Sequence, residues 1–445
     1  MLTTIGLKTK IGLGLLLSYS SYTLYVSYAS RNEITRRAQL DAQQQKSRLL
    51  EEHDNENDNH NDDGCCHDKY DSMTIAGRFE NPFKEYRAQT LFEFFLTRLL
   101  ELWEGRTRGG VPAKEELRAL LPIYKPDFEL LEKTSLLNGL KDEMRSIKGI
   151  PELKNRMTFT WLGQSCSFLQ ISGVNILTDP LFADYLVNPY IGPKRITPSP
   201  CELEELPNPH FVLVSHNHPD HLDVDAVKKL HNSTTWVVPM GLRKFFARRG
   251  IHNTIELDWW EKAPLPVPQD PDNLYEVACT PAMHWSGRQL WDSNTTLWCS
   301  FLILKNGKPL FYHAGDTGYV EDLFTKIRDK YGAGTRLAML PCGQYCPQWH
   351  QKPRHINPGE CVKIMEDLQA KKILGVHWGT FVLSSEHFLE PKIKLDQLAR
   401  DMGKVNDIFT PQFGKTLVFD LSKEGEQGER ASLESVRDGK CTIVE

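Results

Sequence analysis

The feature that most constrains this chain is a short segment in which three histidines and an aspartate fall within six positions. It follows the apolar run 211–214 and reads Ser215-His216-Asn217-His218-Pro219-Asp220-His221. Alternate residues of a strand share a face, so we expect His216 and His218 to project to one side and Asp220 and His221 to turn toward a second point. Imidazole nitrogens and carboxylate oxygens together suit zinc, and also iron or manganese. The segment therefore predicts two adjacent metal positions on a loop at a strand end.

The segment lies inside a region with the pattern of an α/β domain. After Arg156, short β-rich runs are separated by turn residues, and helical stretches such as 223–231 and 358–370 lie between later runs. No repeat of fixed period occurs, which gives no support to a solenoid or propeller. A chain of 445 residues with 40% hydrophobic content exceeds the usual length of one domain. One large catalytic domain with an appendage fits these observations.

The N-terminal residues predict a membrane or targeting segment. Lys8 and Lys10 precede an apolar stretch, Ile11–Ala29, and arginines follow it. The stretch approaches the roughly 20 residues needed to span a bilayer, although its Ser, Thr and Tyr residues make it weakly hydrophobic. A cleaved signal peptide is the alternative to an anchor, and the basic, acid-free start also suits an organelle presequence. We expect location at the mitochondrial inner membrane, with the endoplasmic reticulum as the alternative.

Two further segments precede the α/β region. Residues 43–71 are rich in Asn, Asp, Glu and Gln and predict a linker, and Cys65, Cys66 and His67 lack the paired spacing of a zinc knuckle. Residues 90–103 are apolar on nearly every side, so they must be covered by the domain core, by a partner or by lipid. The sequence does not decide whether this segment packs on the domain core or contacts lipid.

Charge and cysteine content exclude some classes of function. The formal net charge is -5 and the sequence pI is about 6.3, so no general excess of basic residues predicts binding to nucleic acid. The ten cysteines are scattered and do not form a disulfide framework.

The motif His-x-His-x-Asp-His after an apolar strand resembles the signature of the metallo-β-lactamase fold. Thr160-Trp161-Leu162-Gly163 and Leu177-Thr178-Asp179-Pro180 look like that fold's opening strands, with Asp179 supporting the metal loop. His284, Asp316 and His377 follow in the expected order, each at the end of a β-rich run. The resemblance implies an α/β fold, an αβ/βα four-layer sandwich with two mixed β-sheets flanked by helices.

Longer stretches narrow the resemblance to one family, the N-acylphosphatidylethanolamine-hydrolysing phospholipases D. It covers roughly residues 77–421 and is carried by segments such as Arg78-Phe79-Glu80-Asn81-Pro82, Gly192-Pro193-Lys194-Arg195, Ile255-Glu256-Leu257-Asp258-Trp259-Trp260-Glu261 and His377-Trp378-Gly379-Thr380-Phe381. The resemblance implies hydrolysis of N-acylphosphatidylethanolamine to N-acylethanolamine and phosphatidic acid, by a water that two zinc ions activate. A phosphodiesterase or lactonase of the same fold, acting on a soluble substrate, is the alternative.

The resemblance also implies the roles of particular residues. One zinc would be held by His216, His218 and His284, the other by Asp220, His221 and His377, and Asp316 would bridge them. We expect Asp220, Asp316 and His355 to take part in catalysis, and His355 to supply a proton or bind a phosphoryl oxygen, with capping of the next helix as the structural alternative. Tyr190 and His355 would contact the substrate. His313, His350 and His387 are interpreted as packing or surface residues.

These expectations give the chain five parts and a set of partners. The parts are a targeting or membrane segment (1–42), an acidic disordered linker (43–76), a helical extension packed on the catalytic domain (77–155), the metallo-β-lactamase catalytic domain (156–421) and a flexible C-terminal tail (422–445). The expected partners are a phospholipid substrate and a membrane, with no nucleic acid. A homodimer is kept as one option for its assembly.

Overall fold

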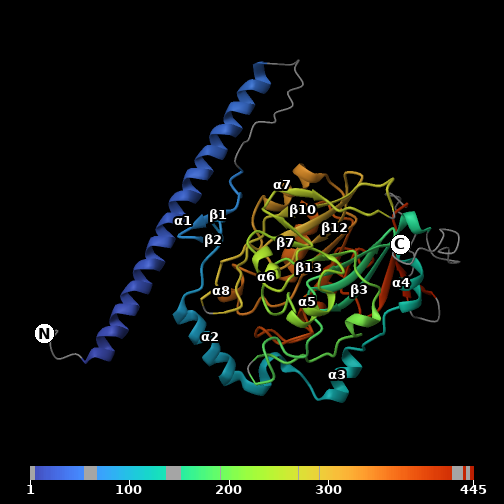
Figure 1. Cartoon of the computed structure of the whole chain (residues 1–445), viewed down its shortest axis with the longest axis horizontal. Helices are drawn as coiled ribbons and strands as arrows, with labels where there is room; N and C mark the ends of the chain where they lie inside the picture. The colour runs from blue at the N-terminus through green and yellow to red at the C-terminus, as the bar shows by residue number, and fades with distance from the viewer. Residues whose placement is uncertain are drawn as a thin grey trace. The chain divides into compact units, whose positions relative to one another are not determined.

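The computed structural model of the chain (Figure 1) describes residues 6–54, 68–136, 152–190, 192–268, 270–289, 291–422, 434–436 and 441–444. The chain divides into two compact units, Met1–Tyr86 and Arg87–Glu445.

The first unit contains one long helix and a small hairpin. Helix α1 spans Leu7–Asp54, and strands β1 (Met73–Ile75) and β2 (Arg78–Glu80) pair in antiparallel fashion. The helix continues into the segment expected to be a linker, because Gln, Lys, Arg and Leu there favour helix. The rest of that expected linker, with Cys65, Cys66 and His67, lies outside the described residues. Within the described ranges, no helix combines the length and apolar character needed to cross a membrane.

The second unit is built on two mixed β-sheets. The first sheet has the strand order β17-β18-β16-β3-β4-β5-β6-β7-β8. Its strands span Arg156–Gly163 (β3), Cys166–Ile171 (β4), Val174–Thr178 (β5), Phe211–Leu213 (β6), Thr235–Pro239 (β7), Thr254–Leu257 (β8), Thr416–Asp420 (β16), Glu434–Val436 (β17) and Cys441–Val444 (β18). Strands β17 and β18 lie within the segment expected to be a flexible tail; β18 is rich in β-branched residues and extends the edge beside β16.

The second sheet has the order β15-β14-β13-β12-β11-β10-β9. Its strands span Lys262–Pro264 (β9), Tyr275–Thr280 (β10), Ser300–Lys305 (β11), Lys308–His313 (β12), Leu337–Pro341 (β13), Lys372–Val376 (β14) and Ile408–Phe409 (β15). The two sheets pack face to face, since the rings of Phe159 in β3 and Phe311 in β12 have centroids 6.3 Å apart. Every residue of β3 is buried, and its sequence alternates apolar Met157, Phe159 and Trp161 with polar residues, so its two faces differ in character.

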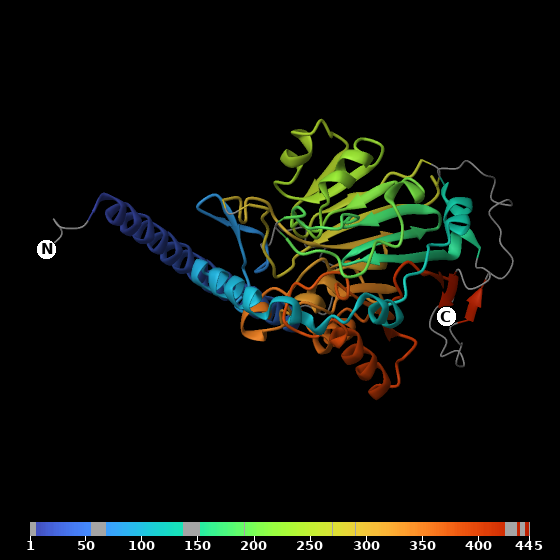
Figure 2. The same cartoon turned by 90° about the horizontal axis from the view of Figure 1, so that it is seen from below.

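Helices cover the outer faces of the sheets (Figure 2). Helices α5 (Val224–Leu230) and α6 (Arg243–Ala247) pack on the first sheet through a cluster that includes Val227, Trp236 and Phe246. Helices α7 (Leu323–Tyr331), α9 (Pro358–Asp367) and α10 (Glu390–Asp401) cover the second sheet. The remaining helices are α2 (Leu91–Glu104), α3 (Lys114–Leu120), α4 (Phe128–Thr134) and α8 (Gln348–Gln351). Two mixed sheets flanked by helices confirm the expected fold class.

The topology brings several strand ends to one edge of the molecule. Strands β5, β6 and β7 pair in parallel in one sheet, and β12, β13 and β14 pair in parallel in the other. The residues that follow the carboxyl ends of parallel strands form loops at the same edge, where α/β proteins commonly bind ligands. The histidine-rich segment follows β6, His284 follows β10, Asp316 follows β12 and His377 follows β14. The fold therefore gathers the predicted site residues from both sheets.

Candidate metal centre

The loop after β6 supplies four of the predicted ligands. It has no helix or strand of its own, yet His216 and His221 are almost completely buried. Asp179, at the end of β5, fixes the start of the loop: its carboxylate accepts hydrogen bonds from the backbone N–H and the hydroxyl of Ser215, both at 2.7 Å. The start of the loop is thus anchored to the residue that follows β5.

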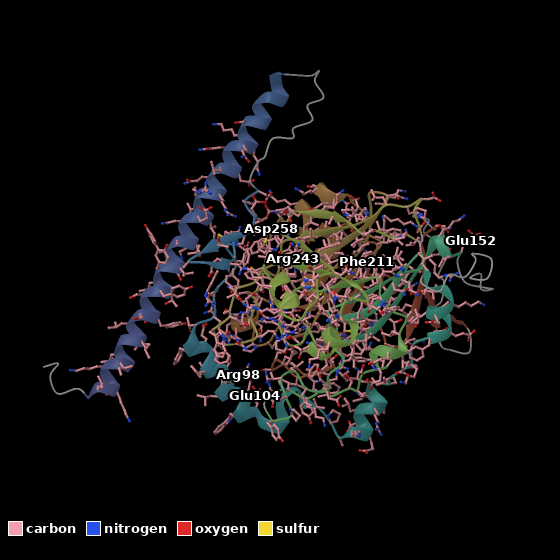
Figure 3. All side chains as sticks on the ribbon, in the orientation of Figure 1. Arg98, Glu104, Glu152, Phe211, Arg243 and Asp258 are labelled. Atoms are coloured by element: carbon pink, nitrogen blue, oxygen red, sulfur yellow. The ribbon has the colours of Figure 1, made fainter. Side chains whose placement is uncertain are left out.

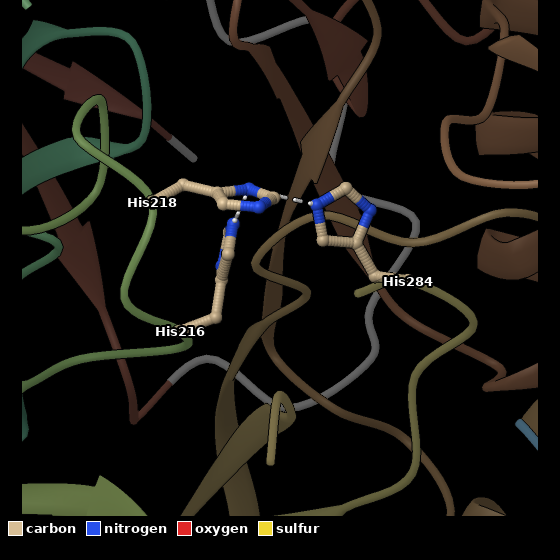
Figure 4. A group of neighbouring side chains, drawn as sticks. All are labelled: His216, His218 and His284. Carbon is tan, nitrogen blue, oxygen red and sulfur yellow. Dashed lines mark hydrogen bonds between the residues drawn. The ribbon is translucent and has the colours of Figure 1, made fainter. Parts of the chain in front are cut away.

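Three histidines form the first group of candidate ligands (Figure 4). His216 Nε2 lies 2.8 Å from His218 Nδ1, and His284 Nε2 lies 3.3 Å from the same His218 atom. Ligands on a tetrahedral zinc, with bonds of about 2.0–2.1 Å, are separated by roughly 3.3 Å. All three side chains are buried, and their nitrogens converge on one point. The spacing of the group therefore suits one metal ion.

Two carboxylates and two histidines form the second group. His221 Nε2 and His377 Nε2 are 3.2 Å apart, and each lies 3.5 Å from Asp220 Oδ2. Asp316 lies 3.1 Å from both histidine nitrogens through its two oxygens. Asp316 Oδ2 is also 3.7 Å from His284 Nε2 of the first group. Asp316 is the residue that connects the two groups.

The electrostatics of the two groups also suit bound cations. Burial lowers the pKa of His218 and of His284 to about 3, which leaves neutral imidazoles able to donate a lone pair. At His377, burial lowers the pKa, but Asp316 and Asp220 outweigh it and raise the value to about 9. Within the described residues, the only ion-pair partners of the two carboxylates are histidines. Buried negative charge without a lysine or arginine partner indicates a site that a metal ion would neutralise.

A second layer of hydrogen bonds orients these ligands. Asp179 Oδ2 lies 2.8 Å from His221 Nδ1 and 2.9 Å from His313 Nε2. Burial raises the pKa of Asp179, but His313 and His221 outweigh it and lower the value to about 2, so this carboxylate stays ionised. Such carboxylate–histidine contacts fix the ring orientation of a metal ligand. His313 was interpreted from sequence as a packing residue; the structure gives it a place in this layer, and its position three residues before Asp316 was the only signal.

Sequence reasoning also missed Gln164. Its side-chain Nε2 lies 3.1 Å from Asp220 Oδ2 and 3.0 Å from His377 Nε2. Its backbone carbonyl accepts a hydrogen bond from the backbone N–H of His377. Gln164 directly follows the Trp161-Leu162-Gly163 run, so its place at a strand end was a usable signal.

The two predicted substrate contacts have different surroundings. His355 is buried, and its Nδ1, 3.8 Å from Asp316 Oδ2, has no hydrogen-bond partner among the described residues. The following helix α9 is capped by the side chain of Asn357, so helix capping is not the role of His355. Tyr190 is 96% exposed, and no contact of its side chain with the two ligand groups is found in the described part of the chain.

A pocket that is partly open to solvent adjoins the second group. Gln164 and His377 lie at the metal-side end of its wall, and Phe381, Val382 and Leu383 supply much of the rest. A polar end beside the carboxylates and an apolar wall beyond it can receive a molecule with one polar and one apolar part.

Comparison with known proteins agrees with this arrangement. Residues 174–378 match the family described as "Beta-lactamase superfamily domain". Together with the two mixed sheets and the buried ligand groups, the match defines a metal-dependent hydrolase of the metallo-β-lactamase superfamily.

Comparison with individual proteins identifies the family within this superfamily. The chain is 47% identical, over 92% of its length and 87% of the relative, to "N-acyl-phosphatidylethanolamine-hydrolyzing phospholipase D, mitochondrial" of Saccharomyces cerevisiae. It is 38% identical, over 58% of its length and 74% of the relative, to "N-acyl-phosphatidylethanolamine-hydrolyzing phospholipase D 1" of Caenorhabditis elegans. An uncharacterized protein of Mycobacterium tuberculosis is 35% identical over 54% of this chain and 63% of its own length. The chain belongs to the N-acyl-phosphatidylethanolamine-hydrolyzing phospholipase D family, which confirms the resemblance drawn from its motifs.

Proposed function

We propose that this chain hydrolyses N-acylphosphatidylethanolamine to N-acylethanolamine and phosphatidic acid, with two Zn²⁺ per chain. The observation that carries the proposal is the pair of buried ligand groups joined by Asp316, because it offers two adjacent cation positions beside an open cavity. The names of the yeast and nematode relatives supply the substrate.

Each residue of the site has a proposed task. His216, His218 and His284 would hold one ion, Asp220, His221 and His377 the other, and Asp316 both. When bound, the two ions would lower the pKa of a water molecule and neutralise charge that develops on the phosphoryl oxygens. Asp179, which also contacts His313, fixes the ring of His221 through Nδ1, so that Nε2 would be free to bind an ion. The chain thus supplies a fixed frame, and no serine or cysteine nucleophile is required.

His355 is the proposed contact to the phosphoryl group. Burial lowers the pKa of its imidazole well below the usual value, so a neutral ring faces the site. Its unpartnered Nδ1 can then donate a hydrogen bond to a phosphoryl oxygen, provided that Nδ1 carries the proton. Tyr190, on an exposed loop, is proposed to contact the lipid head group as the bilayer approaches.

We further propose that the chain works at a mitochondrial membrane. The name of the yeast relative supports the organelle, and the basic N-terminal residues support the inner membrane. Large apolar side chains form an exposed stripe along one side of α2, and this stripe supports contact with lipid. Their exposed fractions lie between 46% and 90%, and the residues are Phe92, Phe95, Leu99, Leu100 and Trp103. The opposite side of α2 includes the buried Thr97. The proposed domain boundaries remain those given by the sequence, with residues 156–421 as the catalytic domain.

The test uses the purified full-length chain and liposomes that contain N-acylphosphatidylethanolamine, with and without a chelator. Mass spectrometry of the lipids should detect N-acylethanolamine and phosphatidic acid only in the absence of chelator. Cleavage of a soluble phosphodiester such as bis(p-nitrophenyl) phosphate without any lipid cleavage, by a protein with two metals bound, would move the function to a soluble substrate.

A further inference from the structure

Few charged side chains line the pocket beside the metal centre. Among the described residues, no lysine, arginine or aspartate lines it. The carboxylate of Glu386 does line it, but its two oxygens accept hydrogen bonds from the backbone N–H groups of Gln344 (2.6 Å) and Cys346 (3.1 Å). These two hydrogen bonds hold the Glu386 carboxylate in place and partly compensate its charge. The remaining side chains of the wall include neutral amides and apolar groups, which suit the amide and hydrocarbon parts of a ligand.

The side-chain amide oxygen of Gln344 lies in the wall of this pocket and accepts no hydrogen bond from the described residues. This oxygen, Oε1, is buried. The backbone of Gln344 is held by Glu386, and its φ of 66° lies in the left-handed region, so the residue is fixed by its surroundings. A buried carbonyl oxygen without a donor is unfavourable, and a ligand that brings an N–H group would relieve that.

Apolar side chains continue the wall on the side away from the metal centre. Phe381, Val382 and Leu383 lie in the segment after His377, and all line the same cavity as Gln344. The segment is buttressed by the turn that follows α2: a side-chain carbon at Gly109 would approach Val382 to 2.8 Å. A fixed apolar wall next to one amide acceptor fits a secondary amide that carries a hydrocarbon chain.

We propose that this cavity binds the amide of the N-acylethanolamine part of the substrate. Gln344 Oε1 accepts the amide N–H, and Phe381, Val382 and Leu383 contact the first methylenes of the acyl chain. An unacylated ethanolamine head group has neither the amide N–H that Gln344 Oε1 accepts nor the hydrocarbon chain that the apolar wall contacts. The subsite therefore selects the N-acylated lipid. The inference rests on the proposed function and assigns the source of its specificity.

The test compares three lipids in liposomes with the metal-loaded full-length enzyme: N-palmitoylphosphatidylethanolamine, its N-methylated amide analogue and phosphatidylethanolamine. For the unmodified enzyme, kcat/KM should fall about tenfold when N–CH₃ replaces the amide N–H, as expected for one lost hydrogen bond. In Gln344→Leu, kcat/KM for the lipid with an amide N–H should fall about tenfold. The ratio of kcat/KM for the N–H lipid to kcat/KM for the N–CH₃ lipid should then approach one. Inhibition by N-palmitoylethanolamine should weaken to a similar degree.

Two further variants secure the interpretation. Gln344→Glu retains an acceptor and adds a charge, so it should keep the preference for the N–H amide and gain relative activity on phosphatidylethanolamine. Gln348→Leu, an exposed glutamine in α8, should leave all ratios unchanged. An identical N–H to N–CH₃ ratio in the unmodified enzyme and in Gln344→Leu would refute the subsite alone. Failure of the unmodified enzyme to cleave either acylated lipid would instead refute the proposed function, and the subsite with it.

Discussion

At the scale of single residues, Asp316 holds the position on which both ligand groups depend. Its carboxylate lies within 3.7 Å of histidine nitrogens from the two groups. Asp316→Asn keeps the shape but removes the negative charge, so we expect fewer than two zinc ions per chain and a loss of turnover of more than about 100-fold. Elemental analysis and lipid hydrolysis check both effects. Asp225→Asn, at an exposed aspartate, is the matched control, and two bound zincs in Asp316→Asn would show that the bridging assignment is wrong.

A substitution at His313 tests whether the hydrogen bonds that orient His221 affect metal affinity. His313 donates to the same Asp179 oxygen that His221 contacts, so its loss should free that carboxylate to turn and loosen His221. In His313→Leu we expect the affinity for the second zinc to fall about 10–100-fold while the first stays bound. Zinc titration with a chelating indicator measures the two affinities separately. An exposed histidine changed in the same way, His252→Leu, should have no effect; equal loss of both ions in His313→Leu would point to general unfolding instead.

The residues that the sequence could and could not predict differ in how their contacts arise. His216, His218, Asp220 and His221 are neighbours in the chain, so spacing alone suggested their grouping. Gln164 and His377 are in contact although they are far apart in the sequence. Neither local spacing nor composition predicts such a contact. Gln344 has an ordinary polar side chain whose significance depends on Glu386, and only the folded chain brings the two together.

At the scale of elements, strand ends and capping residues explain why the site forms where it does. The β-rich runs predicted after Arg156 became strands because their residues pack between layers, and α9 begins where Asn357 and Glu360 form a capping box. The segment 90–103 could not be decided from sequence, since a helix that is apolar all round carries no information on which side is covered. The structure gives α2 one packed side and one exposed stripe.

The exposed stripe of α2 leads to a prediction about lipid binding. Phe95→Ser combined with Leu99→Ser removes two side chains from the centre of the stripe, so binding of the full-length chain to phosphatidylcholine–phosphatidylethanolamine vesicles should weaken by at least about tenfold. Vesicle flotation measures this, and hydrolysis of a short-chain soluble analogue should be retained. Leu274→Ser, at another exposed leucine, is the control. Unchanged vesicle binding together with a change from dimer to monomer would mean that α2 contacts a second copy of the chain.

At the scale of the whole molecule, the candidate metal centre gathers residues from the two sheets. The loop after β6 belongs to the first sheet, whereas Asp316 and His377 follow β12 and β14 of the second. An ion held by ligands from both sheets binds the folded state and has no comparable site in the unfolded chain. Metal binding should therefore stabilise the fold as well as supply chemistry.

Removal of the metal should accordingly lower the melting temperature. A ligand present at about 100 times its Kd stabilises the folded state by about 2.7 kcal/mol, which corresponds to roughly 5 °C for a unit of this size. Calorimetry of the full-length chain before chelation, after chelation and after added Zn²⁺ should show a reversible shift of that order. In His221→Ala combined with His284→Ala, which removes one ligand from each group, chelation should shift the melting temperature little. A shift of the same size in this double variant would place the stabilising ion elsewhere, and the two sheets would then have to be held together by their apolar interface alone.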